Sequence, residues 1–246
     1  MGFGLAAEGD AVVCRKGDLA IVGPLLLLAA MAVDFRTIYD ADFRGKTVLD
    51  IGGCIGESAV YFARRGASRV IVYEPVPEHH RFIRLNCSRN AVNAELHEAG
   101  VGESDGTMAV HYDYVTPGLG EGSTGKRIAS FKVRNLADVI RTSGADIAKL
   151  NCEGGEKALL AVGGDVLRLV PLYLIEAHSA ELRQSLLDKF VASGFEVVED
   201  RLYGKDIGRG QTLHILAFRR IDRNDLGAQW NRPRRDSRRA RPARRQ

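Results

Sequence analysis

Two carboxylates stand at or near the ends of short apolar runs, where their side chains could contact a ligand. Asp50 belongs to the run 47–51, and Glu74 closes the run that starts at Arg69. Short runs with β-branched residues predict buried strands, and the ends of neighbouring parallel strands meet at one edge of a sheet. A carboxylate there can accept hydrogen bonds from both hydroxyls of a ribose. Two of them form an acidic site, which suits a ligand that carries a positive charge and no phosphate.

The segment after Asp50 predicts a glycine turn that leads into a helix. Gly52, Gly53 and Gly56 allow a tight turn and a close approach of the backbone to a ligand. From Glu57 onward the apolar residues follow a helical period. Free amide groups and the helix dipole collect at such a helix start, so strand, turn and helix form a nucleotide cradle. The spacing is not the Gly-x-Gly-x-x-Gly of dinucleotide-binding proteins. The alternative is a Rossmann-like strand pair with an incidental glycine turn.

Five segments of the chain, in order, resemble the FkbM-type methyltransferase domain. They fall within residues 45–200 and read VLDIGGCIGESAVYFARRG, VIVYEP, AGVGESDG, DIAKLNCEGGEKALL and LYLIEAH. The most specific piece is residues 149–156, KLNCEGGE, which is similar to the family's K-I-D-x-E-G-x-E. Two positions depart from the family pattern: Asn151 replaces an aspartate, and Cys54 stands where asparagine is common.

The resemblance implies a class I methyltransferase that uses S-adenosylmethionine and usually methylates a hydroxyl oxygen. It also implies a cofactor site at the matching positions. The methionine portion would lie at Asp50, Gly52, Gly53, Cys54 and Gly56, the ribose at Glu74 and Pro75, the adenine at Ala99, Gly100 and Val101, and the transferred methyl group at Asn151 and Glu153. We predict no metal ligands.

A hydroxyl acceptor must lose its proton in or near the transition state. Among the histidines, His178 alone follows a predicted strand at the edge where open α/β sheets bind ligands. We therefore predict His178 as the general base, with Glu176 orienting it or the acceptor; the alternative is a structural, hydrogen-bonded histidine. Asn151 can only orient or hydrogen-bond, because an amide does not act as a base. The other histidines are predicted to be structural, with His79 and His80 on an exposed helix.

The order of apolar runs and helical patterns predicts an α/β fold. Such alternation gives a doubly wound, mainly parallel seven-stranded sheet, Rossmann-like as in methyltransferases, with an antiparallel edge strand. The expected strands span residues 47–51, 69–74, 94–101, 145–151, 172–175, 195–198 and 213–218. Besides the helix that starts at Glu57, helices are expected at 77–90, 136–141, 156–169 and 181–193. An additional hairpin strand is expected over 107–114. The glycine-rich loop that follows, 115–128, is either a lid over a ligand or an insertion, and we favour the lid.

The chain divides into three expected parts. Residues 1–45 form a small N-terminal cap, with a hairpin over 11–22 and a helix over 25–38, whereas residues 1–9 show no periodic pattern. Residues 46–220 form the methyltransferase domain. Residues 221–246 form a basic tail, predicted to be disordered because its last part, 231–246, holds almost nothing apolar.

Charge and cysteine usage limit the partners and the compartment. The stretch 231–246 holds eight arginines and one aspartate, a charge of +7 in a chain whose total is +4, so the rest carries −3. Such a tail favours RNA or another polyanion, and the alternative is a solvated extension without a function. The four cysteines are scattered, which predicts no zinc site or disulfide framework and favours the cytoplasm. The apolar run 21–33 is too short, and too broken by Gly23-Pro24, to span a membrane.

Three hypotheses follow from these features. The first is an S-adenosylmethionine-dependent O-methyltransferase that acts on a hydroxyl of a small molecule or glycan. The second is an RNA methyltransferase of the same fold that holds the RNA backbone with the arginine-rich tail. The third is a binding module for an adenosine ligand without catalysis.

Overall fold

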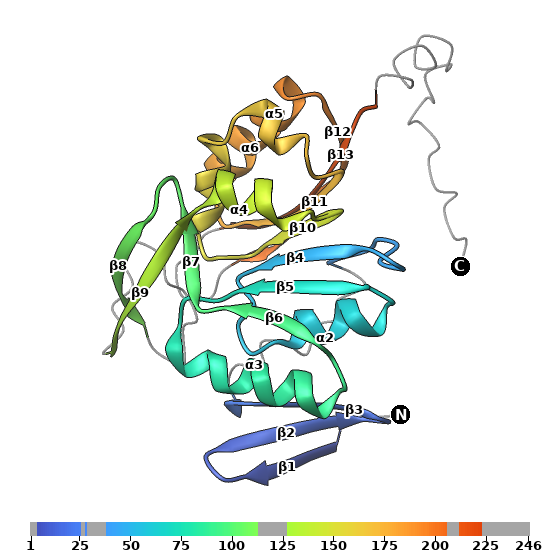
Figure 1. Ribbon diagram of the computed structural model, residues 1–246, viewed down its shortest axis with the longest axis vertical. Coiled ribbons are helices and arrows are strands. Elements are labelled where there is room, and N and C mark those ends of the chain that lie inside the picture. The colour runs from blue at the N-terminus through green and yellow to red at the C-terminus, as the bar shows by residue number, and fades with distance from the viewer. Residues whose placement is uncertain (1–3, 26–27, 29–37, 113–126, 206–211, 223–246) are drawn as a thin grey trace, which may run out of the picture.

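The centre of the fold is a seven-stranded sheet with the order β12-β13-β11-β10-β4-β5-β6. The computed structural model describes residues 4–25, 28, 38–112, 127–205 and 212–222. Neighbours from β11 to β6 pair in parallel, whereas β13 pairs antiparallel with both β11 and β12 (Figure 1). The strands are β4 (Thr47–Ile51), β5 (Arg69–Tyr73), β6 (Ala94–His97), β10 (Ile147–Leu150), β11 (Leu172–Ala177), β12 (Phe195–Lys205) and β13 (Thr212–Arg220). The predicted doubly wound sheet with an antiparallel edge is confirmed.

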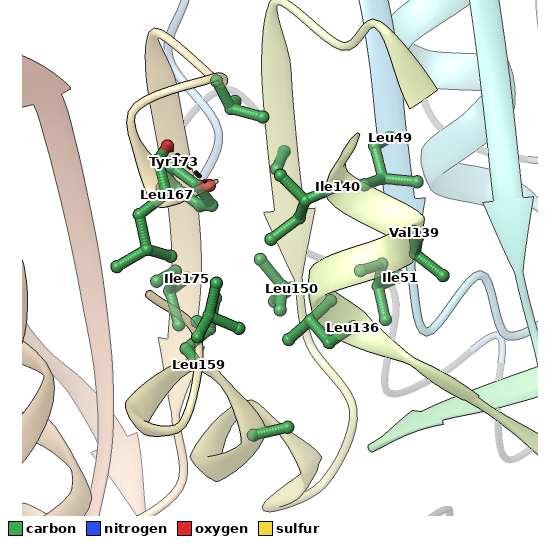
Figure 2. Close-up of a cluster of buried hydrophobic side chains, with 14 of the residues drawn as sticks. Leu49, Ile51, Leu136, Val139, Ile140, Leu150, Leu159, Leu167, Tyr173 and Ile175 are labelled. Carbon is green, nitrogen blue, oxygen red and sulfur yellow. Dashed lines mark hydrogen bonds between the residues drawn. The ribbon is translucent and has the colours of Figure 1, made fainter. Parts of the chain in front are cut away.

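Helices cover both faces of this sheet, because successive residues of a strand point to opposite sides and both sides are apolar. Val48 and Val70 pack toward α2 (Glu57–Arg64) and α3 (Pro77–Arg89). Leu49 and Ile51 belong to the opposite cluster, which Figure 2 shows. On that side lie α4 (Leu136–Ser143), the 3-10 helix η2 (Gly155–Leu160), α5 (Gly164–Leu167) and α6 (Ala180–Ala192). None of the helices within the described residues is long and apolar enough to cross a membrane.

The N-terminal segment forms a separate antiparallel sheet of three strands. They are β1 (Gly4–Glu8), β2 (Ala11–Lys16) and β3 (Leu19–Gly23), so the predicted hairpin is present and a further strand lies where no pattern was visible. Asn86 of α3 joins this sheet to the main domain. Its fully buried side chain accepts from Val22 N at 2.7 Å and donates to Val22 O at 2.9 Å and Ile55 O at 2.8 Å. Most of the predicted helix 25–38 lies outside the described residues.

Two of the predicted elements are wrong. The strand expected over 94–101 is interrupted at Glu98: β6 ends at His97, and β7 (Ala99–Gly102) joins a second small sheet of order β7-β9-β8. There it pairs with β9 (Arg127–Asn135), a strand that was not predicted, which also pairs with β8 (Gly106–Tyr112). The helix expected over 156–169 is instead the pair η2 and α5, because Gly163 and Gly164 interrupt it with an extended residue. Residues 115–126 of the predicted lid lie outside the described residues.

Candidate functional site

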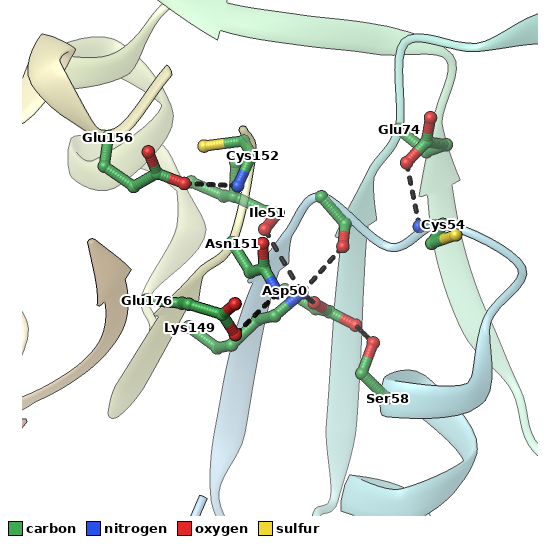
Figure 3. A network of polar contacts seen from close by, with 11 residues as sticks. Asp50, Ile51, Cys54, Ser58, Glu74, Lys149, Asn151, Cys152, Glu156 and Glu176 are labelled. Carbon is green, nitrogen blue, oxygen red and sulfur yellow. Dashed lines mark hydrogen bonds and ion pairs between the residues drawn. The ribbon is translucent and has the colours of Figure 1, made fainter. Parts of the chain in front are cut away.

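A buried ion pair lies beneath the glycine loop, between two central strands. Asp50 of β4 and Lys149 of β10 are partners in the parallel register of these strands. Lys149 Nζ donates to Asp50 Oδ1 at 2.8 Å, and Ser58 Oγ donates to Asp50 Oδ2 at 2.6 Å (Figure 3). The Asp50 side chain is fully buried. Both of its oxygens therefore bind protein donors below the loop, whereas the sequence placed this carboxylate beside the ligand.

Lys149 also holds the loop itself. Its ammonium donates to Gly52 O at 2.7 Å and Ile51 O at 3.3 Å, so its three donor positions all have partners. Burial alone would lower the pKa of Lys149, but the charge of Asp50 outweighs it and raises the pKa, so the ammonium stays charged. Lys149 was not among the predicted site residues. The available signal was a charged residue inside the apolar strand 147–150, which requires a buried partner.

The glycines of the loop are required by packing as well as by backbone conformation. A Cβ on Gly52, whose φ is +80°, would lie 1.8 Å from Asn151 O. A Cβ on Gly53 would lie 2.2 Å from Val72 Cγ1. Cys54, between them and the helix, has a φ of 45°, a conformation that few non-glycine residues adopt. The loop is thus pressed against the strand ends, and its glycines are explained by protein atoms before any ligand is considered.

Glu74 lies at the tip of β5 with its carboxylate fixed beside the loop. Its Oε2 accepts from Cys54 N at 2.8 Å, while Oε1 accepts from Val76 N at 2.9 Å and lies 3.1 Å from His79 Nδ1. The Nε2 of His80 lies 2.8 Å from the carbonyl oxygen of Glu74. The prediction that His79 and His80 are exposed is wrong, because each is only 6% exposed. These two histidines orient Glu74, and Oε2 keeps acceptor capacity for a further donor.

The positions predicted for the adenine lie next to Glu74 along β7. A Cβ on Gly100 would lie 3.0 Å from Phe131 Cε2 and 3.5 Å from Pro75 Cβ, so these three residues are neighbours. Ala99 is buried in the hydrophobic core, while Gly100 and Val101 are partly buried. Phe131 comes from β9, and it could not be predicted because the strand that carries it was not recognised.

On the other side of the loop, polar side chains gather at the ends of β10 and β11. Asn151 Nδ2 donates to Glu176 Oε2 at 3.1 Å (Figure 3). Glu176 is 8% exposed, and burial raises the pKa of its carboxyl group above the ordinary value, an effect that the nearby His178 opposes. Among the described residues, no group of three or more His, Cys, Asp and Glu side chains has the arrangement of a metal site.

His178 lies among three carboxylates. Its Nδ1 is 3.4 Å from Glu156 Oε1, and its Nε2 is 3.7 Å from Glu153 Oε1 and 4.0 Å from Glu176 Oε1. Burial alone would lower the pKa of His178, but the contacts with Glu153 and Glu156 outweigh it and raise the pKa to about 11. At neutral pH the ring is therefore an imidazolium cation, which has no free nitrogen to accept a proton. This geometry does not favour the predicted role of His178 as a general base.

The stability of the protein should fall with rising pH because of His178. Its pKa is about 11 in the folded state and about 6.5 in an unfolded chain, so its contribution is complete below pH 6.5 and is lost toward pH 11. Over that range one extra bound proton changes the free energy of unfolding by at most about 1.4 kcal/mol per pH unit. Denaturant unfolding between pH 7 and pH 10 should show that the free energy of unfolding depends less steeply on pH in His178→Gln than in the wild type. In His97→Gln, whose ring is 37% exposed, the slope should match the wild type.

No family model matches the sequence, and no curated protein matches it. Among solved structures, a proposed S-adenosylmethionine-dependent methyltransferase from Streptococcus mutans has a TM-score of 0.53 at 10% identity, over 87% of this chain and 56% of that one. The tRNA m1G37 methyltransferase of M. jannaschii has a TM-score of 0.52 at 11% identity, over 89% of this chain and 59% of that one. A proposed RNA methyltransferase from Pyrococcus horikoshii has a TM-score of 0.48 at 15% identity, over 80% of this chain and 83% of that one.

The chain therefore spans less than two thirds of the first two of these structures. TM-scores of 0.53 and 0.52 show a shared fold, but identities of only 10% and 11% leave the methyl acceptor open. The chain has the Rossmann-like fold of class I S-adenosylmethionine-dependent methyltransferases.

Proposed function

We propose that the protein is an S-adenosylmethionine-dependent methyltransferase of the FkbM type, which methylates a hydroxyl group of a small molecule or glycan. The observation that carries this proposal is the Glu74 carboxylate, fixed at the tip of β5 by Val76 N and His79 and facing the glycine loop. In this fold, that position is suited to the hydroxyls of a ribose. Residues 46–220 would form the catalytic domain, residues 1–45 the cap and residues 221–246 the tail.

The residues present fit a cationic nucleoside better than a phosphate-bearing one. Glu57 and Glu74 are acidic and lie beside the loop, while the buried Lys149 is paired with Asp50 and donates to two loop carbonyls. Glu74 would hold the ribose, the loop backbone around Gly53 and Cys54 the methionine portion, and the neighbours Pro75, Gly100 and Phe131 the adenine. The cofactor, when bound, supplies a methyl group already activated for transfer.

The acceptor would be handled at the ends of β10 and β11. Methyl transfer needs the attacking oxygen aligned with the methyl carbon, and a hydroxyl also needs a group that takes its proton. Glu176 is suited to that role, because its carboxylate lies beside Asn151 at the strand ends and burial raises its pKa above the ordinary value. The Asn151 amide orients Glu176 by donating to Oε2. His178, as a cation, holds Glu153 and Glu176 in place and adds positive charge beside them.

Calorimetry and a methyl-transfer assay test this proposal together. The wild type should bind S-adenosylmethionine and S-adenosylhomocysteine, and it should transfer a labelled methyl group to a component of a cell extract. Glu176→Gln should bind the cofactor as the wild type does but transfer the label about 100-fold more slowly, since a positioned base contributes at least that much. Glu181→Gln, an exposed glutamate of α6, is the matched control. Lack of binding would reject the proposal, and binding without any labelled product would favour the non-catalytic module.

A second candidate, methylation of RNA, is favoured by the eight arginines of residues 231–246. The similar M. jannaschii structure is a tRNA methyltransferase, which makes this acceptor class worth testing. A chain that ends at residue 230 should then bind RNA more weakly and with a smaller salt dependence, because fewer counterions are released. If the acceptor is a small molecule or glycan, the same truncation should leave turnover unchanged.

A further inference from the structure

A carboxylate without an assigned role lies at the start of α2, directly after the glycine loop. Glu57 is the first residue of this helix and follows Gly56, whose φ is 87°. The residue is partly buried, and its Oε2 atom is inaccessible to solvent and has no hydrogen-bond partner among the described residues. A buried acceptor left without a donor is costly, and more so when it is charged. Oε2 therefore has an unmet requirement for a donor, preferably a cation.

The surroundings of Glu57 belong to the predicted cofactor site. Burial raises the pKa of the Cys54 thiol, and the charges of Glu57 and Glu74 raise it further, so both carboxylates lie near this residue of the loop. Burial also raises the pKa of Glu57 to about 7, with the charge of Lys149 acting in the opposite direction. Lys149 cannot satisfy Oε2, because its three donor positions are used by Asp50, Ile51 and Gly52.

We propose that the Glu57 carboxylate binds the ammonium group of the amino-acid portion of the cofactor, an inference that rests on the proposed function. Glu74 accepts from Cys54 N and is placed for the ribose, and α2 starts three residues after Cys54, so the amino-acid portion of the same ligand would lie along the loop toward Glu57. An ammonium offers three donors, and its bond to a carboxylate is charge-assisted.

Two nucleosides that differ in the amino-acid portion test this inference by calorimetry. S-Adenosylhomocysteine carries the ammonium group, whereas 5′-methylthioadenosine has the same nucleoside and thioether without it. Glu57→Gln should weaken binding of S-adenosylhomocysteine about 10- to 100-fold, the range for a charge-assisted hydrogen bond, and change binding of methylthioadenosine less than about 2-fold. Glu181→Gln, also a glutamate in the first turn of a helix, should change neither affinity.

The pH dependence gives a second readout that needs no variant. Affinity of the wild type for S-adenosylhomocysteine, relative to methylthioadenosine, should rise as the pH increases through about 7 and Glu57 loses its proton. An equal loss of both affinities in Glu57→Gln, no loss in either, or a ratio independent of pH would overturn the role of Glu57. If Glu57→Gln does not fold, the pH dependence of this ratio alone decides. Failure of the wild type to bind either nucleoside would instead overturn the proposed function itself.

Discussion

Lys149→Met should lower the free energy of unfolding by about 3–5 kcal/mol, the usual loss when one member of a buried ion pair is removed. Methionine keeps most of the length of the side chain but has no ammonium. The Asp50 carboxylate is fully buried, and it would be left with the Ser58 hydroxyl while its negative charge has no partner. The carbonyls of Ile51 and Gly52 would lose the same donor. Denaturant unfolding at pH 7 measures the change.

A double variant separates the ion pair from the loss of the side chain. Asp50→Asn in the Lys149→Met background removes the unpaired charge, so the double variant should be more stable than Lys149→Met alone. Asp42→Asn is the control, because Asp42 and Arg44 form an ion pair at 2.7 Å whose side chains are 61% and 80% exposed. Removing this exposed pair should hardly change the denaturant midpoint of unfolding. If Lys149→Met is as stable as the wild type, the loop does not depend on this pair.

The order and types of the central elements could be predicted because their signals are local. Each parallel strand is a short apolar run, and the helices around it show a helical period. The wrong predictions occur where the structure is decided by pairing between strands that are far apart in the sequence. The run 94–101 looks continuous, yet β7 leaves the main sheet because β9, about 30 residues later, offers it a partner. The apolar pattern of 94–101 does not contain that information.

Glu74, Asn151 and His178 do follow the ends of neighbouring strands as expected, but several of the predicted roles depend on neighbours that the sequence does not show. His178 follows a strand as expected, and the charge state of its ring is set by Glu153 and Glu156. His79 and His80 look exposed on a helix with many charged residues, yet both turn inward to hold Glu74. A histidine's role is set by the groups around it, and those groups come from other elements of the chain.

In the glycine loop, the sequence again predicts the local turn but does not show which neighbouring residues it contacts. The spacing of Gly52, Gly53 and Gly56 correctly predicted a turn between a strand and a helix. The ligand is not needed to explain these glycines, because Asn151 O and Val72 Cγ1 occupy the space that side chains would take at Gly52 and Gly53. The close approach of the two backbones therefore helps to hold the tips of β4 and β10 together beside the candidate site.

Gly52→Ala should consequently destabilise the protein by roughly 2–5 kcal/mol. This loss combines the cost of an alanine in the left-handed backbone conformation with the cost of overpacking. Its Cβ would lie 1.8 Å from Asn151 O and 2.8 Å from the carbonyl carbon, and backbone atoms cannot rotate away as a side chain can. Gly144→Ala isolates the conformational part, because Gly144 also has a positive φ, +62°, and no atom lies within 4 Å of the place that its Cβ would take. Gly144→Ala should therefore cost only about 1–2 kcal/mol. Equal losses in the two variants, measured by denaturant unfolding, would mean that the loop yields to the added methyl group and that close packing against Asn151 does not hold the strand tips together.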